Sequence, residues 1–346
     1  MKCTIQNIAD HLGLSRNTVS KALKNSSEVS ENTRNLVIKT ASKLGYKNAT
    51  FATPVIPASE TGSNGTILFL TRTYASDSEF WTTVLRGIES ILSNANYHLA
   101  ISIMSDSDLK QLNFPQTISD SSIKGIILVE ICDKVVCDAL SQFNLPIVSV
   151  DMPNVPFEEL NGIDVVTMES KKNLKKIINQ LIEKGAESFG FVGDLYSPNV
   201  SRGFQERYNA LSECLAEHQL PLNQKNCLLH QTPEDFRNFQ TTVNNLQAMI
   251  SLPDVFICGN DWTAIQLIYA LQFLGFQIPK DICVVGFDNI PAASRISPSL
   301  TTISTPQKYL GIAAARQILE RIQHPNCPHV FCQYETELII RNSTNI

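Results

Sequence analysis

Two short helical patterns joined by a glycine turn open the chain and restrict how its N-terminal end can fold. Apolar residues recur on one helical stripe at Ile5, Ile8, Ala9 and Leu12. Gly13 follows the stripe, and glycine readily adopts the left-handed backbone that a sharp turn between two helices requires. The pattern predicts a helix-turn-helix, a motif whose second helix enters the major groove of DNA.

The second helix is expected to present its first turn to DNA. Ser15 is placed as its N-cap, which puts Arg16 and Asn17 on the first turn, where a recognition helix contacts base edges. A third helical pattern begins after a second N-cap, Ser30, and ends at Gly45. Three helices of this kind are enough to enclose a small apolar core.

Charge separates this headpiece from the rest of the chain. Residues 1–50 carry eight Lys or Arg against three acidic residues, a net charge of +5, whereas the whole chain carries −5. A basic module on an acidic body is typical of binding to a polyanion such as duplex DNA. A solvated three-helix domain that binds protein is the alternative, but the cap, the turn glycine and the Arg-Asn pair together favour DNA.

A polar linker follows the headpiece, which comprises residues 1–47. Residues 48–65 contain two prolines and show no sustained hydrophobic period. From residue 66 onward, short apolar runs alternate with helical patterns in two series, which predicts an α/β fold of two doubly wound parallel-sheet lobes. The expected strands are 66–71, 99–104, 125–130, 147–150, 188–193, 227–230, 255–258 and 282–287, and the expected helices are 80–92, 108–118, 134–143, 200–217, 234–250 and 261–274.

Polar and aromatic residues stand where several of these strands end, which is where doubly wound sheets bind ligands. Carboxylates and amides at such places can pair with the hydroxyls of a sugar, and flat aromatic side chains can cover its apolar ring faces. Each residue also has a simpler alternative, as a turn cap or as part of the core. The residues concerned are Phe80, Trp81, Asp151, Asn260, Asp261, Asp288 and Asn289.

Composition narrows the class of protein further. No apolar run approaches the ~20 residues of a membrane span, and the N-terminus lacks the apolar core of a secretory signal, so we expect a cytoplasmic protein. The nine cysteines include no Cys-x-x-Cys pair and are expected to be reduced thiols. Near the C-terminus, His324, Cys327, His329 and Cys332 match no usual zinc spacing, so neither a metal nor a cofactor is expected.

Longer motifs make a resemblance specific over nearly the whole chain. The sequence resembles the lactose/galactose-repressor (LacI/GalR) family of bacterial transcription factors. The motifs that carry the resemblance are Thr4-Ile-Gln-Asn-Ile-Ala and residues 14–25, 29–30, 44–46, 258–264, 274–289, 298–303 and 337–344.

The resemblance implies an allosteric repressor with a periplasmic-binding-protein-like core. Two headpieces of a homodimer would bind a pseudo-palindromic operator, while a small effector binds between the lobes of each core. The first lobe would comprise about 66–164 and 292–326, and the second about 165–291 and 327–346. No leucine-heptad tail follows Ile346, so a coiled-coil tetramer is not expected.

Matched position by position, the resemblance also implies the residues that contact DNA. Arg16 and Asn17 correspond to the family's base-reading pair. Lys21 takes a place where arginine is commonest, and because lysine lacks a planar fork it would read guanine less rigidly. Contacts to phosphates would position the headpiece without distinguishing sequences. The residues matched to such contacts are Thr4, Ser15, Thr18, Ser20, Val29, Ser30 and Arg34.

The effector site implied by the resemblance joins both lobes. Arg207 matches the family's effector-gripping arginine, and Ala210 stands where glycine is usual. A guanidinium could bridge two hydroxyls or one carboxylate, but two carboxylates lining the same site favour a neutral polyol such as a sugar. The residues matched to the effector are Phe80, Trp81, Asp151, Arg207, Asn260 and Asp288.

The linker departs from the family pattern. The family's linker forms a short hinge helix on DNA, with an Ala-Arg-x-Leu pattern whose leucine enters the minor groove. Here Ala52 is retained, but Thr53, Pro54 and Val55 replace that pattern. Proline inside a helix costs ~3 kcal/mol and disfavours a helical conformation for the residue before it, so we expect a weaker minor-groove kink.

Three alternatives to a repressor stay open at this stage. An enzyme on a doubly wound fold is one. The segment 190–193 contains neither the Gly-x-Gly-x-x-Gly pattern nor the Gly-Lys-Ser/Thr ending of a phosphate-binding loop, however, and the six dispersed histidines suggest no catalytic triad. A transport-type sugar-binding protein shares the bilobed design, but the basic headpiece and the missing export signal count against it. An activator would look the same in sequence.

Overall fold

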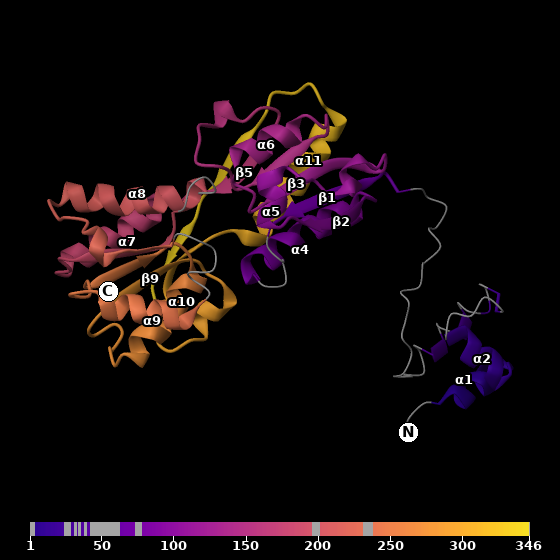
Figure 1. Cartoon of the computed structure of the whole chain (residues 1–346), viewed down its shortest axis with the longest axis horizontal. Coiled ribbons are helices and arrows are strands. Elements are labelled where there is room, and N and C mark those ends of the chain that lie inside the picture. Colours follow the sequence, from indigo (N-terminus) through magenta and orange to yellow (C-terminus); the bar gives the residue numbers. More distant parts are fainter. Residues whose placement is uncertain are drawn as a thin grey trace. The chain divides into compact units, whose positions relative to one another are not determined.

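The computed structural model describes residues 4–23, 29–30, 33, 36–37, 40–41, 63–72, 78–195, 201–230 and 238–345. It divides into two compact units, Met1–Gly62 and Ser63–Ile346. The first unit is the headpiece with its linker, and the second is the bilobed core (Figure 1).

The headpiece begins with two capped helices, α1 (Ile5–Leu12) and α2 (Arg16–Leu23). Gly13 ends α1 with a left-handed backbone, φ 64°, as its sequence position predicts. Residues 33, 36–37 and 40–41 are helical and contribute to the third predicted helix. The small core collects apolar side chains from all three segments, namely Ile8, Ala9, Val19, Ala22, Val29, Val37 and Ala41.

The core unit contains two six-stranded sheets, and each forms the centre of one lobe. The first sheet has the strand order β11-β5-β4-β3-β1-β2, and all its pairs are parallel. The second has the order β12-β10-β9-β8-β6-β7, and only β12 runs antiparallel to its neighbour. The expected α/β class with two parallel-sheet lobes is therefore confirmed.

The elements of the first lobe alternate along the chain as a doubly wound fold requires. Its strands are β1 (Thr66–Thr71), β2 (His98–Ile103), β3 (Ile123–Val129), β4 (Ile147–Val150), β5 (Asp164–Met168) and β11 (Phe331–Tyr334). Its helices are α4 (Glu79–Asn94), α5 (Asp106–Gln111), α6 (Lys134–Ser141) and α11 (Gln307–Gln323), with 3-10 turns at Gln116–Ser119 and Phe157–Glu159.

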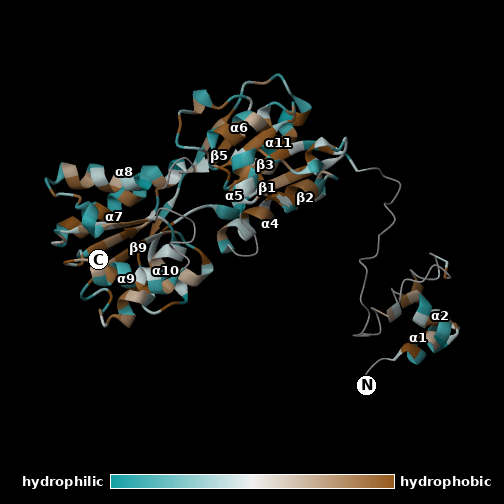
Figure 2. Ribbon diagram, in the orientation of Figure 1, coloured by the Kyte–Doolittle hydropathy of each residue, from teal (hydrophilic) through white to brown (hydrophobic). Residues whose placement is uncertain are grey.

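The second lobe repeats this plan. Its strands are β6 (Phe189–Asp194), β7 (Leu228–His230), β8 (Val255–Cys258), β9 (Cys283–Asp288), β10 (Thr301–Ser304) and β12 (Glu337–Ile339). Its helices are α7 (Lys172–Glu183), α8 (Arg202–Glu217), α9 (Phe239–Ala248) and α10 (Asp261–Phe273), with 3-10 turns at Gln224–Asn226 and Pro291–Ser294. In Figure 2 the hydrophobic colour concentrates on the strands, while the outward faces of the helices are hydrophilic.

The chain crosses between the lobes later than the sequence boundaries place it. Strand β5 and strand β11 both belong to the first sheet, whereas β10 belongs to the second. The crossings therefore follow Met168, Ser304 and Tyr334 rather than residues 164, 291 and 326. The sequence analysis also missed β5, β10, β11, β12, α7 and α11, and its helix 108–118 is broken after α5 by Leu112, whose φ is 54°.

Close backbone packing of α11 on α4 fixes the orientation of the α4 N-terminus. A Cβ atom added to Gly311 would lie 2.0 Å from the Val84 carbonyl oxygen, and one added to Gly87 would lie 2.2 Å from the Lys308 carbonyl oxygen. Only glycine permits this approach. The first turn of α4, which carries Phe80, is thereby held at the junction of the lobes.

Candidate functional site

The recognition helix exposes the residues that the sequence assigns to base edges. Arg16 and Asn17 are exposed on the first turn of α2, and Lys21 is partly exposed one turn further along the same side. The Ser15 hydroxyl accepts a hydrogen bond from the Thr18 backbone N–H at 3.0 Å, which caps the helix. The structure thus presents these side chains together on one turn of a capped helix.

The residues matched to phosphate contacts lie in different environments. Thr4 and Ser30 are exposed, and each caps the segment that follows it, Thr4 through Asn7 and Ser30 through the backbone N–H of Thr33 at 3.3 Å. Val29 differs, because its side chain is buried in the headpiece core. Its assignment to DNA stays a prediction. Arg34 and the hinge residues Ala52, Thr53, Pro54 and Val55 lie outside the described residues.

Arg207 is the central charged residue at the junction of the lobes. It lies on α8 with only 3% of its surface exposed. Its Nη1 donates a hydrogen bond to the Gly259 carbonyl oxygen at 2.6 Å, and its guanidinium carbon lies 3.6 Å from the centre of the Phe287 ring. Its Nε has no hydrogen-bond partner among the described residues. A buried donor without a partner is costly, so Nε is placed to donate a hydrogen bond to an oxygen of a ligand or of water.

The carboxyl groups of Asp288 and Asp261 interact electrostatically with this arginine. Burial raises the pKa of Asp288 well above its ordinary value, and Arg207 only partly opposes that effect. Burial likewise raises the pKa of Asp261 to about 6, against hydrogen bonds from the Thr302 hydroxyl at 2.5 Å and the Ile290 backbone N–H at 2.9 Å. Asp261 therefore has its hydrogen bonds supplied within the protein.

Asp151 extends the site into the first lobe and links the two lobes. It directly follows β4, and its Oδ2 accepts a hydrogen bond from the Ser201 hydroxyl of the second lobe at 2.6 Å. Its Oδ1 accepts from the Met152 backbone N–H at 2.7 Å. Burial raises the pKa of Asp151, although both hydrogen bonds and the charge of Arg207 act against it.

Two of the site carboxylates stand on unusual backbone. The φ angle is 77° at Asp151 and 118° at Asp288, values that side-chain-bearing residues rarely adopt. Both residues lie at the carboxyl end of a parallel strand, where doubly wound folds bind ligands. Strained backbone of this kind clusters at functional sites. Asn260, the remaining predicted polar residue, caps α10 through the Thr263 backbone N–H at 2.8 Å.

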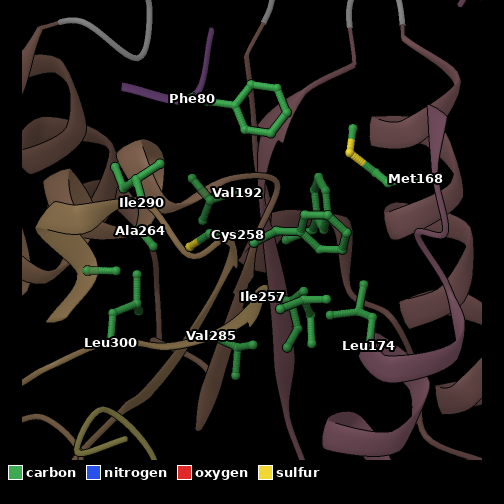
Figure 3. Packing of buried hydrophobic residues seen from close by; sticks show 14 of the residues in the cluster. Phe80, Met168, Leu174, Val192, Ile257, Cys258, Ala264, Val285, Ile290 and Leu300 are labelled. Atoms are coloured by element: carbon green, nitrogen blue, oxygen red, sulfur yellow. The ribbon is translucent and has the colours of Figure 1, made fainter. Parts of the chain in front are cut away.

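The two predicted aromatic residues lie on the first turn of α4. Phe80 and Trp81 are buried and meet edge to face, with ring centres 4.5 Å apart. Both belong to a cluster of buried side chains from the two lobes, and Figure 3 shows Phe80 on the side of Val192 and Ile290. The indole Nε1 of Trp81 donates a hydrogen bond to Oε1 of Glu130.

Comparison with known proteins now decides the family. Residues 4–48 match the model described as bacterial regulatory proteins of the lacI family, and residues 178–344 match the periplasmic binding protein-like domain. Together these matches span more than half of the chain, and they fall on the headpiece and on the site-bearing core. The chain belongs to the lacI family of bacterial regulatory proteins.

Relatives in this family match over almost their whole length. The HTH-type transcriptional repressor PurR of Photobacterium profundum is 26% identical over 98% of each chain, and the ribose operon repressor of Haemophilus influenzae is 27% identical over 98% of each chain. The complex of the transcriptional regulator CelR with cellobiose has a TM-score of 0.69 at 19% identity, covering 99% of this chain and 100% of that one. The lac repressor dimer bound to operator has a TM-score of 0.67 at 18% identity and covers 100% of both chains.

Membership of the lacI family favours a DNA-binding regulator over the enzyme and the transport protein that the sequence left open. The family model describes bacterial regulatory proteins, and the two relatives are named as repressors, which are not enzymes. The chain is therefore a transcriptional regulator. Within the part of the chain that the structure describes, no helix is long and apolar enough to cross a membrane.

The structure adds two polar residues that the sequence analysis did not assign to the site. Ser201 pairs with Asp151, and Glu130 pairs with Trp81. Glu130 was detectable in principle, because it is the last residue of the predicted strand 125–130, and in the structure it directly follows β3 as Asp151 follows β4. Ser201 follows no strand, and only the contact between the lobes reveals it.

Proposed function

We propose that this lacI-family regulator is a homodimeric repressor whose affinity for a pseudo-palindromic operator is set by a sugar bound between its lobes. The headpiece of residues 1–47 would bind DNA, the segment 48–65 would link it to the core, and the core of residues 66–346 would bind the sugar and form the dimer. Such a protein acts where the chromosome is, in the cytoplasm. The proposed effector-binding residues are Phe80, Trp81, Asp151, Arg207, Asn260 and Asp288.

The unpartnered Nε of buried Arg207 is the observation that carries this proposal. A charged donor in a buried place needs an acceptor, and a ligand oxygen would supply one. The neighbouring Asp151 and Asp288 stand on strained backbone at strand ends. Residues whose conformations cost folding free energy therefore lie together at one place, as is usual for a functional site.

The charge balance of the site indicates the ligand class. Burial lowers the pKa of Arg207, and the charges of the nearby Asp288, Asp151 and Asp261 only partly oppose this effect. A further anion would be repelled by these carboxylates, whereas hydroxyl groups can donate to them. Ring-shaped polyols also suit the aromatic pair Phe80 and Trp81. The names of the ribose operon repressor and of the CelR complex with cellobiose agree with a carbohydrate.

At the operator, exposed side chains of α2 would read base edges. Arg16 and Asn17 are placed for direct contacts, and Lys21 would add a contact that is less rigid than arginine makes. The other matched headpiece residues would contact phosphates. Pro54 in the linker would weaken hinge-helix formation and so the minor-groove kink.

A thermal-shift screen of the full chain tests the sugar site. D-ribose, cellobiose and a panel of other mono- and disaccharides are added at rising concentration, because a ligand at 100 times its Kd stabilises the folded state by ~2.7 kcal/mol. The shift should be lost in Arg207→Ala and in Asp288→Asn. Arg295→Ala, which removes an exposed arginine of the same lobe, should keep it. A hit whose shift survives both site substitutions would place the sugar elsewhere.

Binding to DNA needs a separate measurement. Genomic fragments enriched on the immobilised full chain give the operator, and fluorescence anisotropy then measures operator affinity with and without the active sugar. We expect the sugar to change this affinity at least fivefold, the usual lower range of allosteric coupling. Equal affinity for the operator and for bulk competitor DNA under all conditions would contradict the proposed function.

A further inference from the structure

A carboxylate outside the predicted site holds one of its aromatic side chains. The indole N–H of Trp81 donates to Oε1 of Glu130, a residue 49 positions further along the chain. The backbone of Trp81 is also fixed, since its N–H donates to the hydroxyl of the N-cap Ser78 at 3.3 Å. With Phe80 meeting Trp81 edge to face, three neighbours determine where the indole plane lies.

Glu130 has the backbone features of the assigned site carboxylates. It directly follows β3, as Asp151 directly follows the adjacent strand β4. Its φ angle is 59°, in the left-handed region that residues with side chains seldom occupy. After burial itself, the charges of Asp151 and Glu130 both raise the pKa of the Cys132 thiol, so the two carboxylates lie in the same neighbourhood.

We propose that Glu130 is a positioning residue of the effector site, which fixes the Trp81 indole so that its ring face is offered to a sugar ring. This inference rests on the proposed function. The reason is geometric, because an indole turns about two side-chain torsions and a stacking contact requires one defined plane. Occupying the N–H with Glu130 also leaves the ring face as the part of Trp81 that recognises ligand. The occupant is then a ring with an apolar face, such as a pyranose or a furanose.

Intrinsic fluorescence provides a readout that a general loss of stability would not reproduce. The chain has two tryptophans, so the surface substitution Trp262→Phe leaves Trp81 as the only one. In this background Glu130→Leu removes the acceptor, whereas Glu130→Gln keeps an acceptor oxygen. We expect the Trp81 emission to move to shorter wavelength in Glu130→Leu and to stay close to that of the parent in Glu130→Gln.

Sugar affinity is measured on the same full-chain variants, with D-ribose and cellobiose as the first probes. Because a hydrogen bond to a charged group is lost, Glu130→Leu should weaken binding about tenfold, and Glu130→Gln should retain most of it. Glu158→Leu, which removes an exposed carboxylate of the same lobe, should leave both emission and affinity unchanged.

A double-mutant cycle separates this bond from other effects of Glu130. Trp81→Phe keeps an aromatic face but has no N–H donor, so adding Glu130→Leu to it should cause no further loss of affinity. An equal loss with and without the indole N–H would overturn the inference, as would unchanged emission and affinity in Glu130→Leu. If the wild-type chain binds no sugar, the proposed function is wrong and Glu130 has no part in sugar binding. If the wild-type chain binds a sugar and Glu130→Leu binds it with unchanged affinity, only the inference fails.

Discussion

Arg321 of α11 and Asp164 of β5 form a bidentate ion pair inside the first lobe. Nη2 lies 2.8 Å from Oδ1 and Nε lies 2.9 Å from Oδ2, and the two side chains are 5% and 0% exposed. The remaining guanidinium hydrogens bond to backbone carbonyls of the loop 325–328, including Pro328 at 2.8 Å. The pair therefore ties the loop that leads into edge strand β11 to the start of a neighbouring strand.

Breaking this pair from one side should destabilise the core strongly. Arg321→Met leaves the buried Asp164 carboxylate without its cation, and such changes cost about 3–5 kcal/mol. The exposed Arg316 on the same helix provides the matched control, and Arg316→Met should change the free energy of unfolding by about 0.5 kcal/mol or less. Urea unfolding followed by circular dichroism measures both. Equal stability of the two variants would show that the ion pair contributes little.

The same carboxylate predicts a loss of stability in acid. Burial by itself would raise the pKa of Asp164, but hydrogen bonds from Arg321, Val330 and Gln317 outweigh it and hold the pKa below its ordinary value. A carboxyl group whose pKa is lower in the folded chain than in the unfolded chain, where it is ~3.9, stabilises the fold at pH values above ~3.9. This stabilisation is lost as the pH falls through the pKa of the folded chain. Unfolding measured from pH 5 to pH 2 should show this loss in the wild type. The variant Asp164→Asn should lack the part of this acid-induced loss of stability that comes from Asp164.

The pKa of Asp261 predicts that the stability of the fold changes with pH in the opposite direction. Its pKa is raised to about 6, so the folded chain binds the proton more tightly than the unfolded chain does. Asp261 therefore contributes about 3 kcal/mol to the free energy of unfolding below pH ~4, and this contribution is lost as the pH rises through 6. Compared with Asp261→Asn, the wild type should lose stability between pH 4 and pH 7. Parallel pH profiles of the two proteins would contradict the raised pKa.

Gly311 should resist a substitution that usually stabilises helices. Replacing glycine by alanine inside a helix gains about 1 kcal/mol on helix propensity. Here the new Cβ would lie 2.0 Å from the Val84 carbonyl oxygen, so α11 and α4 must separate. We expect Gly311→Ala to destabilise the core by about 1–3 kcal/mol, as overpacking does. Lys308→Ala at an exposed position of α11 is the control, and a stabilised Gly311→Ala would refute the close packing.

Different residues of the headpiece should be responsible for reading bases and for binding phosphates. Losing the exposed Arg16 should relax base preference at one operator position by about 1–3 kcal/mol. Losing Arg34 should weaken binding to all sequences alike and lower the salt slope by about one. Anisotropy titrations on the operator and on single-base variants, at several salt concentrations, distinguish the two. Identical behaviour of both variants would contradict the division of roles.

The sequence predicted the parts of this protein whose signals are local. Gly13 and Ser15 mark a turn and a cap through their own backbone preferences, and both perform these roles in the structure. Mostly apolar strands such as β1 and β4 were placed with their observed bounds. Strand β10 was missed because it is rich in hydroxyl side chains. Its Thr302 is buried, and the hydroxyl is satisfied there by a hydrogen bond to Asp261, which lies 41 residues away.

The amino-acid pattern by itself determined a helix-turn-helix, two parallel sheets and the strand ends at which polar groups gather, because periodicity, caps and turn residues act over a few neighbours. Tertiary structure alone decided where the chain crosses between the lobes and which distant side chains meet. Trp81 meets Glu130 across 49 residues, and Arg321 meets Asp164 across 157. Such pairs depend on the packing of whole elements, and no short stretch of sequence records that packing.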